Sequence, residues 1–228
     1  MAIASKSIAG FFSRFSGRPA PDPEVRSEAA ISPNEPSYPT KALAKFLKVV
    51  QARENPALID LGPVVGSNVT FFGEQLGCRI RVEDIAADIE RHVRDGKPEE
   101  LAAFLTNRFR QEAESVDGIL CWDIFDFLDR AAAEALAQGL TRLLRPDGAL
   151  LAFFSTPEGR AQVYTKFIVV DESTLRHRPY PASRARQKTL QNRDIIRMFE
   201  GLRVAESFLM KNNVRELLFR KPAYLSGV

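Results

Sequence analysis

ALIDLGPVVGSNVTFFGEQLG, residues 57–77, is an apolar run that ends at an acid and then meets glycine, proline and glycine. ALIDL predicts a buried strand, and SNVTFFGEQL predicts a helix with Ser67 as its N-cap. CRIRVED, residues 78–84, follows at once and predicts a second strand. This strand, helix, strand unit predicts a parallel sheet.

The rest of the chain continues the alternation. Thr40 can cap a helix carrying Leu43, Phe46, Leu47 and Val50, and residues 101–105 form another apolar helical face. VDGILCWDI (116–124) and ALLAFF (149–154) predict strands, separated by an Ala- and Leu-rich helix and an RPDG turn. A mostly parallel sheet with helices on both faces follows. Residues 202–222 differ, since two strand-like runs meet at Asn212 and Asn213, which predicts a C-terminal antiparallel hairpin.

The first 36 residues differ in amino-acid composition from the rest of the chain. Residues 22–39, rich in Pro, Ser and Glu, predict a flexible linker, so we expect a tail over 1–36 and one domain over 37–228. Ahead of the linker, one helical face carries Ile8, Phe11, Phe12 and Phe15, and the only charges before Asp22 are Lys6, Arg14 and Arg18. This segment is suited to a membrane surface or a partner protein. The alternative is a frayed terminus without a role.

Bulk properties restrict the class of protein. The chain has 228 residues, 45% of them hydrophobic, a net charge of +3, and no run near the ~20 apolar residues of a membrane span. Cys78 and Cys121 lie far apart in apolar segments, so we expect buried, reduced thiols in a cytoplasmic protein. Two cysteines and two histidines, His92 and His177, make no zinc spacing, and we expect no metal site.

The turn after the first strand has the features of a nucleoside-binding site. Gly62 and Gly66 allow a ligand to approach the backbone, and the following helix start offers free N–H groups. Glu83 or Asp84, at the end of the next strand, is placed to accept hydrogen bonds from a ribose diol. The alternative is that the glycines serve only the turn and the acids are solvated.

The chain from about Tyr38 to its C-terminus resembles the class I S-adenosylmethionine-dependent methyltransferases. The resemblance rests on IDLGPVVG, VEDI, VDGILCWDIFDFL, LLRPDGALLAFF and the terminal hairpin, which a plain dinucleotide-binding domain lacks. It implies a Rossmann-like three-layer α/β sandwich and S-adenosylmethionine as cofactor. The implied cofactor-binding residues are Asp60, Leu61, Gly62, Pro63, Gly66, Glu83 or Asp84, Cys121 and Trp122.

Two positions depart from the family's pattern. Val64 stands where many members have a middle glycine, and the residue that meets the adenine is not evident. Residues 105–109 are the candidate for a very short third strand, with Asn107 or nothing as the adenine contact. Trp122 has a second interpretation as a core residue, because a single tryptophan is often buried.

Residues 155–190 predict an insertion on the substrate side, with VYTKFIVVD as an added ribbon. Basic residues accumulate in and beyond it: Arg176, Arg178, Arg184, Arg186, Lys188 and Arg193. The predicted substrate residues are Asp123, Arg176, His177, Arg178 and Tyr180, and the basic cluster favours an anionic acceptor. A solvated basic loop is the alternative, and nucleic acid is compatible but not favoured.

The resemblance implies a methyltransferase acting on an unidentified acceptor. Methyl transfer needs mainly alignment and exclusion of water, so the catalytic residue stays unassigned among Asp123, Asp126, His177 and Tyr180. A non-catalytic methyltransferase-like scaffold is the alternative. A nicotinamide-dependent oxidoreductase is a third interpretation, opposed by the terminal hairpin and by the lack of a full Gly-x-Gly-x-x-Gly motif.

Overall fold

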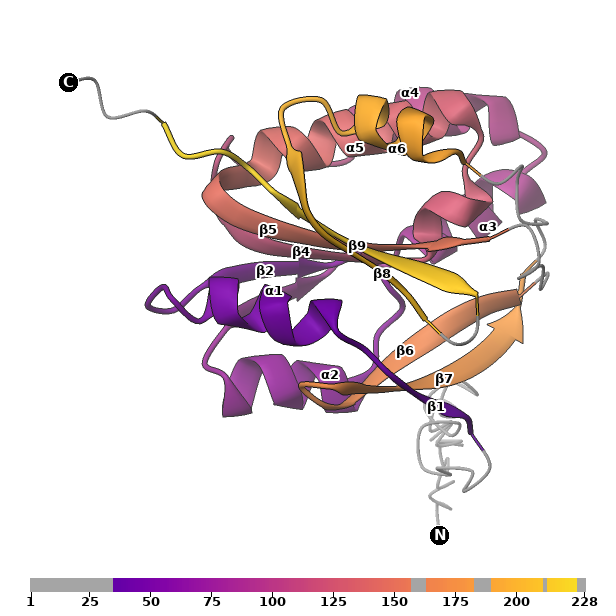
Figure 1. The fold of residues 1–228 in the computed structure, drawn as a ribbon. Helices are drawn as coiled ribbons and strands as arrows, with labels where there is room; N and C mark the ends of the chain where they lie inside the picture. The colour runs from indigo at the N-terminus through magenta and orange to yellow at the C-terminus, as the bar shows by residue number, and fades with distance from the viewer. Residues whose placement is uncertain (1–34, 157–162, 183–189, 211–212, 225–228) are drawn as a thin grey trace, which may run out of the picture. The chain divides into compact units, whose positions relative to one another are not determined.

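The core of the fold is a six-stranded sheet in the order β3-β2-β4-β5-β9-β8. The computed structural model describes residues 35–156, 163–182, 190–210 and 213–224 (Figure 1). The strands are β2 (Ala57–Asp60), β3 (Arg79–Val82), β4 (Val116–Trp122), β5 (Leu144–Ser155), β8 (Arg203–Leu209) and β9 (Val214–Arg220). The first four pair in parallel, and β9 runs antiparallel to both β5 and β8. The predicted mostly parallel sheet with a terminal hairpin is confirmed.

Helices cover both faces of this sheet, as Figure 1 shows. They are α1 (Ala42–Val50), α2 (Gly66–Val69), α3 (Ile85–Arg94), α4 (Leu101–Thr106), α5 (Arg130–Leu143) and α6 (Asn192–Met198). Successive side chains of each strand point to opposite faces of the sheet and so contribute to two separate hydrophobic cores. In β4, Ile119 and Cys121 join the core under α3 to α6, whereas Leu120 and Trp122 join the core under α1. The three-layer sandwich is thus the predicted one.

A second, three-stranded sheet lies beside α2, in the order β1-β7-β6. Its strands are β1 (Ser37–Pro39), β6 (Val163–Asp171) and β7 (Thr174–Pro181), all antiparallel. The predicted ribbon VYTKFIVVD is β6. Its partner β7 carries Arg176 to Tyr180, so the first part of the expected basic loop is a strand. Arg184, Arg186 and Lys188 lie outside the described residues.

Two local predictions are wrong. Ser67 is not an N-cap, because Val65 holds that position without a side-chain hydrogen bond, and the helix continues from α2 into a π-helix, Thr70–Gln75. Residues 105–109 form no strand, since α4 ends at Thr106 and Asn107 turns back to bond Ala103 O. An apolar face of helical spacing outweighed the short strand pattern. The predicted amphipathic segment before residue 35 lies outside the part of the chain that is described.

Candidate functional site

The chain adds β3 on one side of β2 and then β4 on the other side, so the strand order reverses between β2 and β4. Ligands of open α/β sheets bind at such a switch point, beyond the carboxyl ends of the strands. Asp60 ends β2 and Trp122 ends β4. The tertiary structure therefore brings the two predicted cofactor motifs, 57–66 and 116–124, to one crevice.

The crevice is lined by main-sheet strand ends and by the β6–β7 ribbon. Its lining residues are Leu61, Gly62, Pro63, Ala86, Cys121, Trp122, Asp123, Ile124, Tyr164, Thr165 and Tyr180. Five of the predicted cofactor residues thus meet Asp123 and Tyr180 of the predicted substrate site: Leu61, Gly62, Pro63, Cys121 and Trp122. Asp60, Gly66, Glu83 and Asp84 are not among the lining residues, and Gly66 begins α2.

Asp60 is a buried carboxyl at the base of the crevice, with 2% of its surface exposed. Its Oδ1 accepts the backbone N–H of Gly62 at 2.9 Å and the indole N–H of Trp122 at 2.6 Å. Burial raises the pKa of Asp60 to about 6, against the lowering effect of these hydrogen bonds. The nearby charge of Asp84 raises it further. Asp60 therefore orients the glycine turn, as the resemblance implies, and it also holds Trp122.

Trp122 occupies the space above the glycine turn. A Cβ atom at Gly62 would lie 2.8 Å from its Cδ1, so no side chain fits at position 62. The indole stacks on Phe167 of β6, with ring centres 5.2 Å apart and planes 9° apart, and meets Phe153 edge-on. The backbone of Trp122 has a φ of +51°, which is rare for a bulky residue.

The space left in the crevice is about 10 Å³, hardly the volume of one water. Small-molecule sites usually enclose roughly 300–1,000 Å³. The polar groups suit S-adenosylmethionine, because Asp60 and Asp84 can receive an ammonium group and a ribose diol. The space does not suit it, because Trp122 fills the cradle above Gly62. In this conformation the residues do not fit the cofactor.

The two candidate ribose acids, Glu83 and Asp84, have different surroundings. Glu83 is buried and forms ion pairs with Arg81 and Arg108, each at 2.7 Å, and it accepts from Gln111 Nε2 at 3.3 Å. Asp84 is half-buried, caps α3 by accepting the N–H of Ala87, and raises the pKa of Asp60. The charge of Asp84 therefore acts on Asp60 beside the crevice. The ion pairs of Glu83 instead connect β3 to the segment after α4.

Two tyrosines of the ribbon close the crevice from the other side. Tyr164 and Tyr180 stack across β6 and β7 with ring centres 5.3 Å apart. Burial raises the pKa of both phenols, and the charges of Glu90 and Asp123 raise them further. Lys166 lies over the outer face of this pair, 5.6 Å from the ring centre of Tyr180. Among the described residues that line the crevice, Asp123 carries the only charge.

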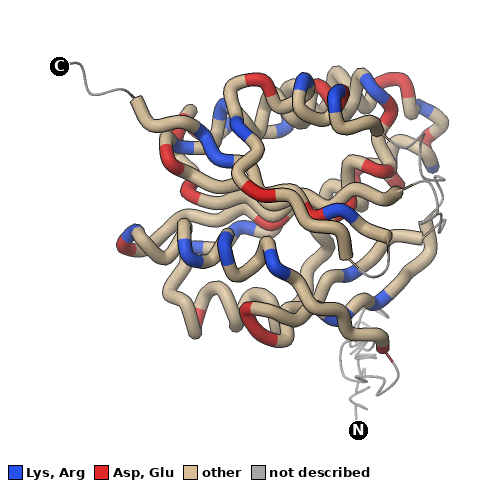
Figure 2. The backbone as a smooth tube through the Cα atoms, viewed as in Figure 1, with Lys and Arg blue, Asp and Glu red and all other residues tan. Residues whose placement is uncertain are grey.

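The predicted basic substrate residues do not point into this crevice. His177 is packed between Tyr38 and Phe167, and burial lowers its pKa to about 4. Arg178 pairs with Glu35, and Arg176 is half-buried opposite Ser37. Asp126, a candidate base, accepts the N–H of Ser155 instead. Figure 2 shows the Lys and Arg positions of the small sheet along its strands.

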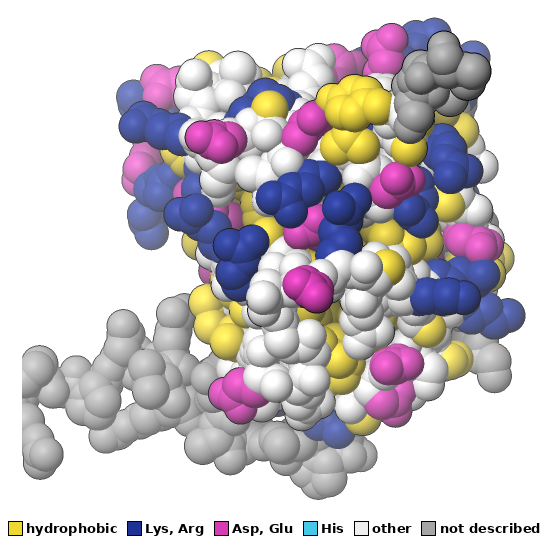
Figure 3. All heavy atoms as spheres, turned by 90° about the vertical axis from the view of Figure 1, so that its left-hand side faces the viewer, with side chains coloured by type: hydrophobic (Ala, Val, Ile, Leu, Met, Phe, Trp, Pro, Cys, Tyr) yellow, Lys and Arg dark blue, Asp and Glu magenta, His cyan; other side chains and the backbone are white. Residues whose placement is uncertain are grey.

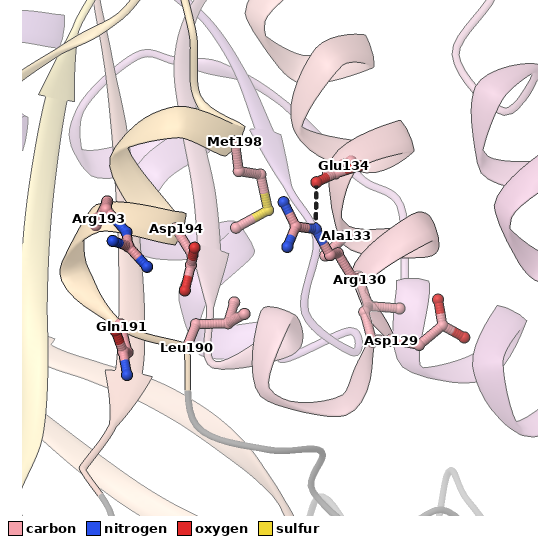
Figure 4. A pocket seen from close by; sticks show the side chains of 10 residues that line it. Asp129, Arg130, Ala133, Glu134, Leu190, Gln191, Arg193, Asp194 and Met198 are labelled. Atoms are coloured by element: carbon pink, nitrogen blue, oxygen red, sulfur yellow. Dashed lines mark hydrogen bonds and ion pairs between the residues drawn. The ribbon is translucent and has the colours of Figure 1, made fainter.

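Larger cavities lie elsewhere in the described part of the molecule. One of about 440 Å³ lies between α5 and α6 (Figure 4). Its lining combines Leu190 and Met198 with charged side chains, among them the Arg130–Glu134 ion pair at 2.8 Å. None of the predicted cofactor residues reaches it. Arg193, predicted as part of the basic cluster, is one of its lining residues.

Another cavity, of about 450 Å³, lies at the amino-end side of the sheet and is lined by Lys48, Arg53, Asp147 and Arg220 among others. Figure 3 shows Lys and Arg side chains gathered on this face. Arg53 and Arg220 both donate hydrogen bonds to the backbone of the β5 turn, to Pro146 O and Asp147 O. Positive charge is therefore concentrated away from the crevice.

Two residues near the site were not predicted: Tyr164, which lines the crevice, and Phe167, which stacks on Trp122. Both lie in the ribbon predicted from VYTKFIVVD, where the spacing shows burial but no partner. The thiols were predicted correctly, since Cys78 and Cys121 are free and buried. Among the described residues, no cluster of histidine, cysteine and acidic side chains is suited to a metal, and no helix has the length and apolar character of a membrane span.

Comparisons with known proteins give structural likeness alone. No protein-family model and no curated protein matches the chain. Among similar solved structures, the PH0226 protein of Pyrococcus horikoshii is 14% identical over 79% of this chain and 88% of its own, with a TM-score of 0.49. DesVI of Streptomyces venezuelae is 15% identical over 80% of this chain and 91% of its own, with a TM-score of 0.49.

A third similar structure is the 1,6-didemethyltoxoflavin-N1-methyltransferase of Burkholderia thailandensis, solved with 1,6-didemethyltoxoflavin and S-adenosylhomocysteine. It is 14% identical over 79% of this chain and 78% of its own, with a TM-score of 0.47. At these identities and TM-scores, neither activity nor substrate transfers to the present chain. The fold class of the present chain is defined by the strand order of its own sheet.

Proposed function

We propose that this protein is an S-adenosylmethionine-dependent methyltransferase of the class I type. The observation that carries the proposal is the position of Asp60, Gly62 and Asp84 at the switch point of a parallel sheet that ends in an antiparallel hairpin. The cofactor, when bound, supplies an activated methyl group. Asp60, which orients the turn, would receive the methionine ammonium, and Asp84 would accept hydrogen bonds from the ribose hydroxyls.

We propose a neutral or cationic acceptor in place of the anionic one expected from the sequence. Asp84, Glu90 and Asp123 all act electrostatically on Tyr180, whereas Arg178 is paired with Glu35 and His177 is buried. Carboxylates beside aromatic rings attract amines and repel phosphates and carboxylates. The wall formed by Tyr164 and Tyr180 also keeps water from the reaction space, which favours a transfer reaction that depends on alignment.

A non-catalytic methyltransferase-like protein is the second candidate. The filled crevice favours it, because Trp122 and Phe167 pack there as core residues pack. In that case the fold serves as a scaffold, and the aromatic cluster contributes to stability alone. This candidate predicts that no variant with an emptied crevice binds the cofactor.

Calorimetric titration with S-adenosylmethionine and S-adenosylhomocysteine tests the proposal. We expect saturable binding by the wild-type protein in the micromolar to millimolar range and a loss of at least tenfold in Asp84→Asn. Glu83→Gln is the matched control, because its carboxylate is engaged by Arg81 and Arg108. No binding at millimolar ligand by either the wild type or Trp122→Ala contradicts the proposal and supports the scaffold.

A further inference from the structure

The indole of Trp122 lies above Gly62 and against Asp60, two of the residues that the proposed function assigns to the cofactor. We propose that Trp122 is a gate: its indole fills the cofactor site of the free protein and must leave for the cofactor to bind. This inference rests on the proposed function and adds a means of regulating access to the same site. The crevice, which Tyr164 and Tyr180 also line, retains about 10 Å³, too little for a cofactor, and the indole is the group that lies above Gly62 and on Asp60.

The contacts of the indole are those that a ligand would replace. Its N–H donates to Asp60 Oδ1 at 2.6 Å, where a ligand ammonium can donate instead. The face of the indole rests on Phe167, where the apolar part of a ligand can pack. The ring thus acts as an internal substitute for the cofactor and competes with it for one carboxylate and one aromatic face.

The aromatic partner of Trp122, Phe167, is anchored through the backbone of β6. Asn68 is buried and binds the backbone of β6 twice: its Nδ2 donates to Phe167 O at 2.7 Å, and its Oδ1 accepts from Val169 N at 2.8 Å. These bonds clamp Phe167 in place. Trp122, in contrast, ends its strand with a φ of +51° beside a shift in register with β5. Strained residues of this kind are found at sites that change conformation.

Two readouts test the gate. Trp122 is the only tryptophan of the chain, so intrinsic fluorescence reports on this indole alone. We expect the emission of the wild-type protein to shift to longer wavelength as S-adenosylhomocysteine saturates it, because the indole moves from its stack on Phe167 to solvent. This measurement needs no variant and stands even if a substitution at position 122 prevents folding.

Calorimetry supplies the second readout. Trp122→Ala removes the indole, and we expect it to bind S-adenosylhomocysteine at least tenfold more tightly than the wild type. Trp122→Phe keeps a ring but not the N–H bond to Asp60, so its affinity should lie between the two. Phe46→Leu loosens the same core under α1 at a residue that does not line the crevice, and it should bind as the wild type does.

The gate is wrong if the wild type binds S-adenosylhomocysteine without a change in emission and Trp122→Ala binds no more tightly. In that case the proposed cofactor function stands. If folded Trp122→Ala and the wild type both fail to bind, the gate and the proposed function fail together. An equal gain of affinity in Phe46→Leu also overturns the gate, because general loosening of the core then explains the effect.

Discussion

At the scale of the residue, two buried ionisable side chains near the crevice oppose each other. Burial raises the pKa of Asp60 from 3.8 to about 6 and lowers the pKa of His177 from 6.5 to about 4. Between pH 4 and 6, folding therefore favours the protonated form of Asp60 and the neutral form of His177. The free energy of unfolding falls with rising pH through Asp60 and rises with rising pH through His177.

Asp60→Asn separates these effects. The amide oxygen can still accept from Gly62 and Trp122, while the buried charge is removed. Above pH 6 we expect the free energy of unfolding of the variant to exceed that of the wild type by about 3 kcal/mol. The rise of the Asp60 pKa from 3.8 to about 6 corresponds to a free energy of this size. The gain should vanish near pH 4, where the wild-type carboxyl is protonated. Urea unfolding at pH 8, 6 and 4 measures it, and a gain that is equal at all three values contradicts the assignment.

His177→Phe tests the opposite slope. As the pH falls from 6.5 to 4, the free energy of unfolding of the wild type should fall by about 3 kcal/mol relative to that of the variant. In this range the imidazole binds a proton in the unfolded chain but stays neutral in the folded protein. Unfolding at pH 8, where the imidazole is neutral in both states, gives the packing difference and serves as the reference. An unchanged difference between pH 8 and pH 4 would show that His177 is protonated in the folded protein.

At the scale of the element, a strand of the C-terminal hairpin caps the first helix. Glu216 of β9 is fully buried, and its Oε2 accepts the backbone N–H groups of Lys41 and Ala42 at 3.1 and 2.9 Å. Thr40 adds the expected local cap by accepting from Leu43. A carboxylate at a helix N-terminus is favourable because free N–H groups and the helix dipole meet it there. The cap joins segments 174 residues apart.

Glu216→Ala should destabilise the protein by about 3 kcal/mol, because charge-assisted hydrogen bonds are lost and two buried donors lose their acceptor. Glu216→Gln retains an amide oxygen and should lose less. Thermal unfolding of the two variants gives the comparison. Thr40→Ala, which removes only the local bond to Leu43, is the control and should cost about 1 kcal/mol. A smaller loss in Glu216→Ala than in Thr40→Ala would contradict the capping role.

At the scale of the whole molecule, the described residues from Glu35 onward belong to one compact unit. The described contacts of this unit begin at Glu35, which pairs with Arg178, and at Pro36, whose carbonyl accepts from His177. β1 then completes the small sheet and places Tyr38 on the imidazole of His177. The ribbon that walls the crevice therefore depends on a segment that precedes the domain's first helix.

Truncation tests this dependence. A chain that starts at Glu35 keeps every described contact, and we expect its Tm to lie within about 2 °C of the full chain. A chain that starts at Thr40 lacks β1 and should melt at least 5 °C lower, since about 2 kcal/mol corresponds to roughly that shift for a domain of this size. Circular dichroism melting curves provide the values. Equal melting temperatures for the two truncations would show that β1 adds nothing to stability.

The sequence by itself determined the order of the elements, the parallel sheet, the terminal hairpin and the acid and glycine at the end of β2. These features follow from local spacing of apolar residues and from turn chemistry, which neighbouring residues decide among themselves. It did not determine that the 105–109 segment stays out of the sheet, nor that α2 continues as a π-helix, because tertiary packing outweighs weak local preferences.

The group that fills the crevice depends on contacts between distant segments of the chain. The pattern marks Trp122 and Phe167 as buried, but hydrophobic spacing records burial and says nothing of the partner. Trp122 and Phe167 are 45 residues apart in the chain. Their rings stack because the β6–β7 ribbon, inserted after β5, folds back over the switch point of the sheet. The same long-range packing engaged Glu83 with Arg108 and left Asp84 to the crevice. Contacts between distant segments depend on the complete set of packed layers, so a closed site of this kind emerges only from the folded chain.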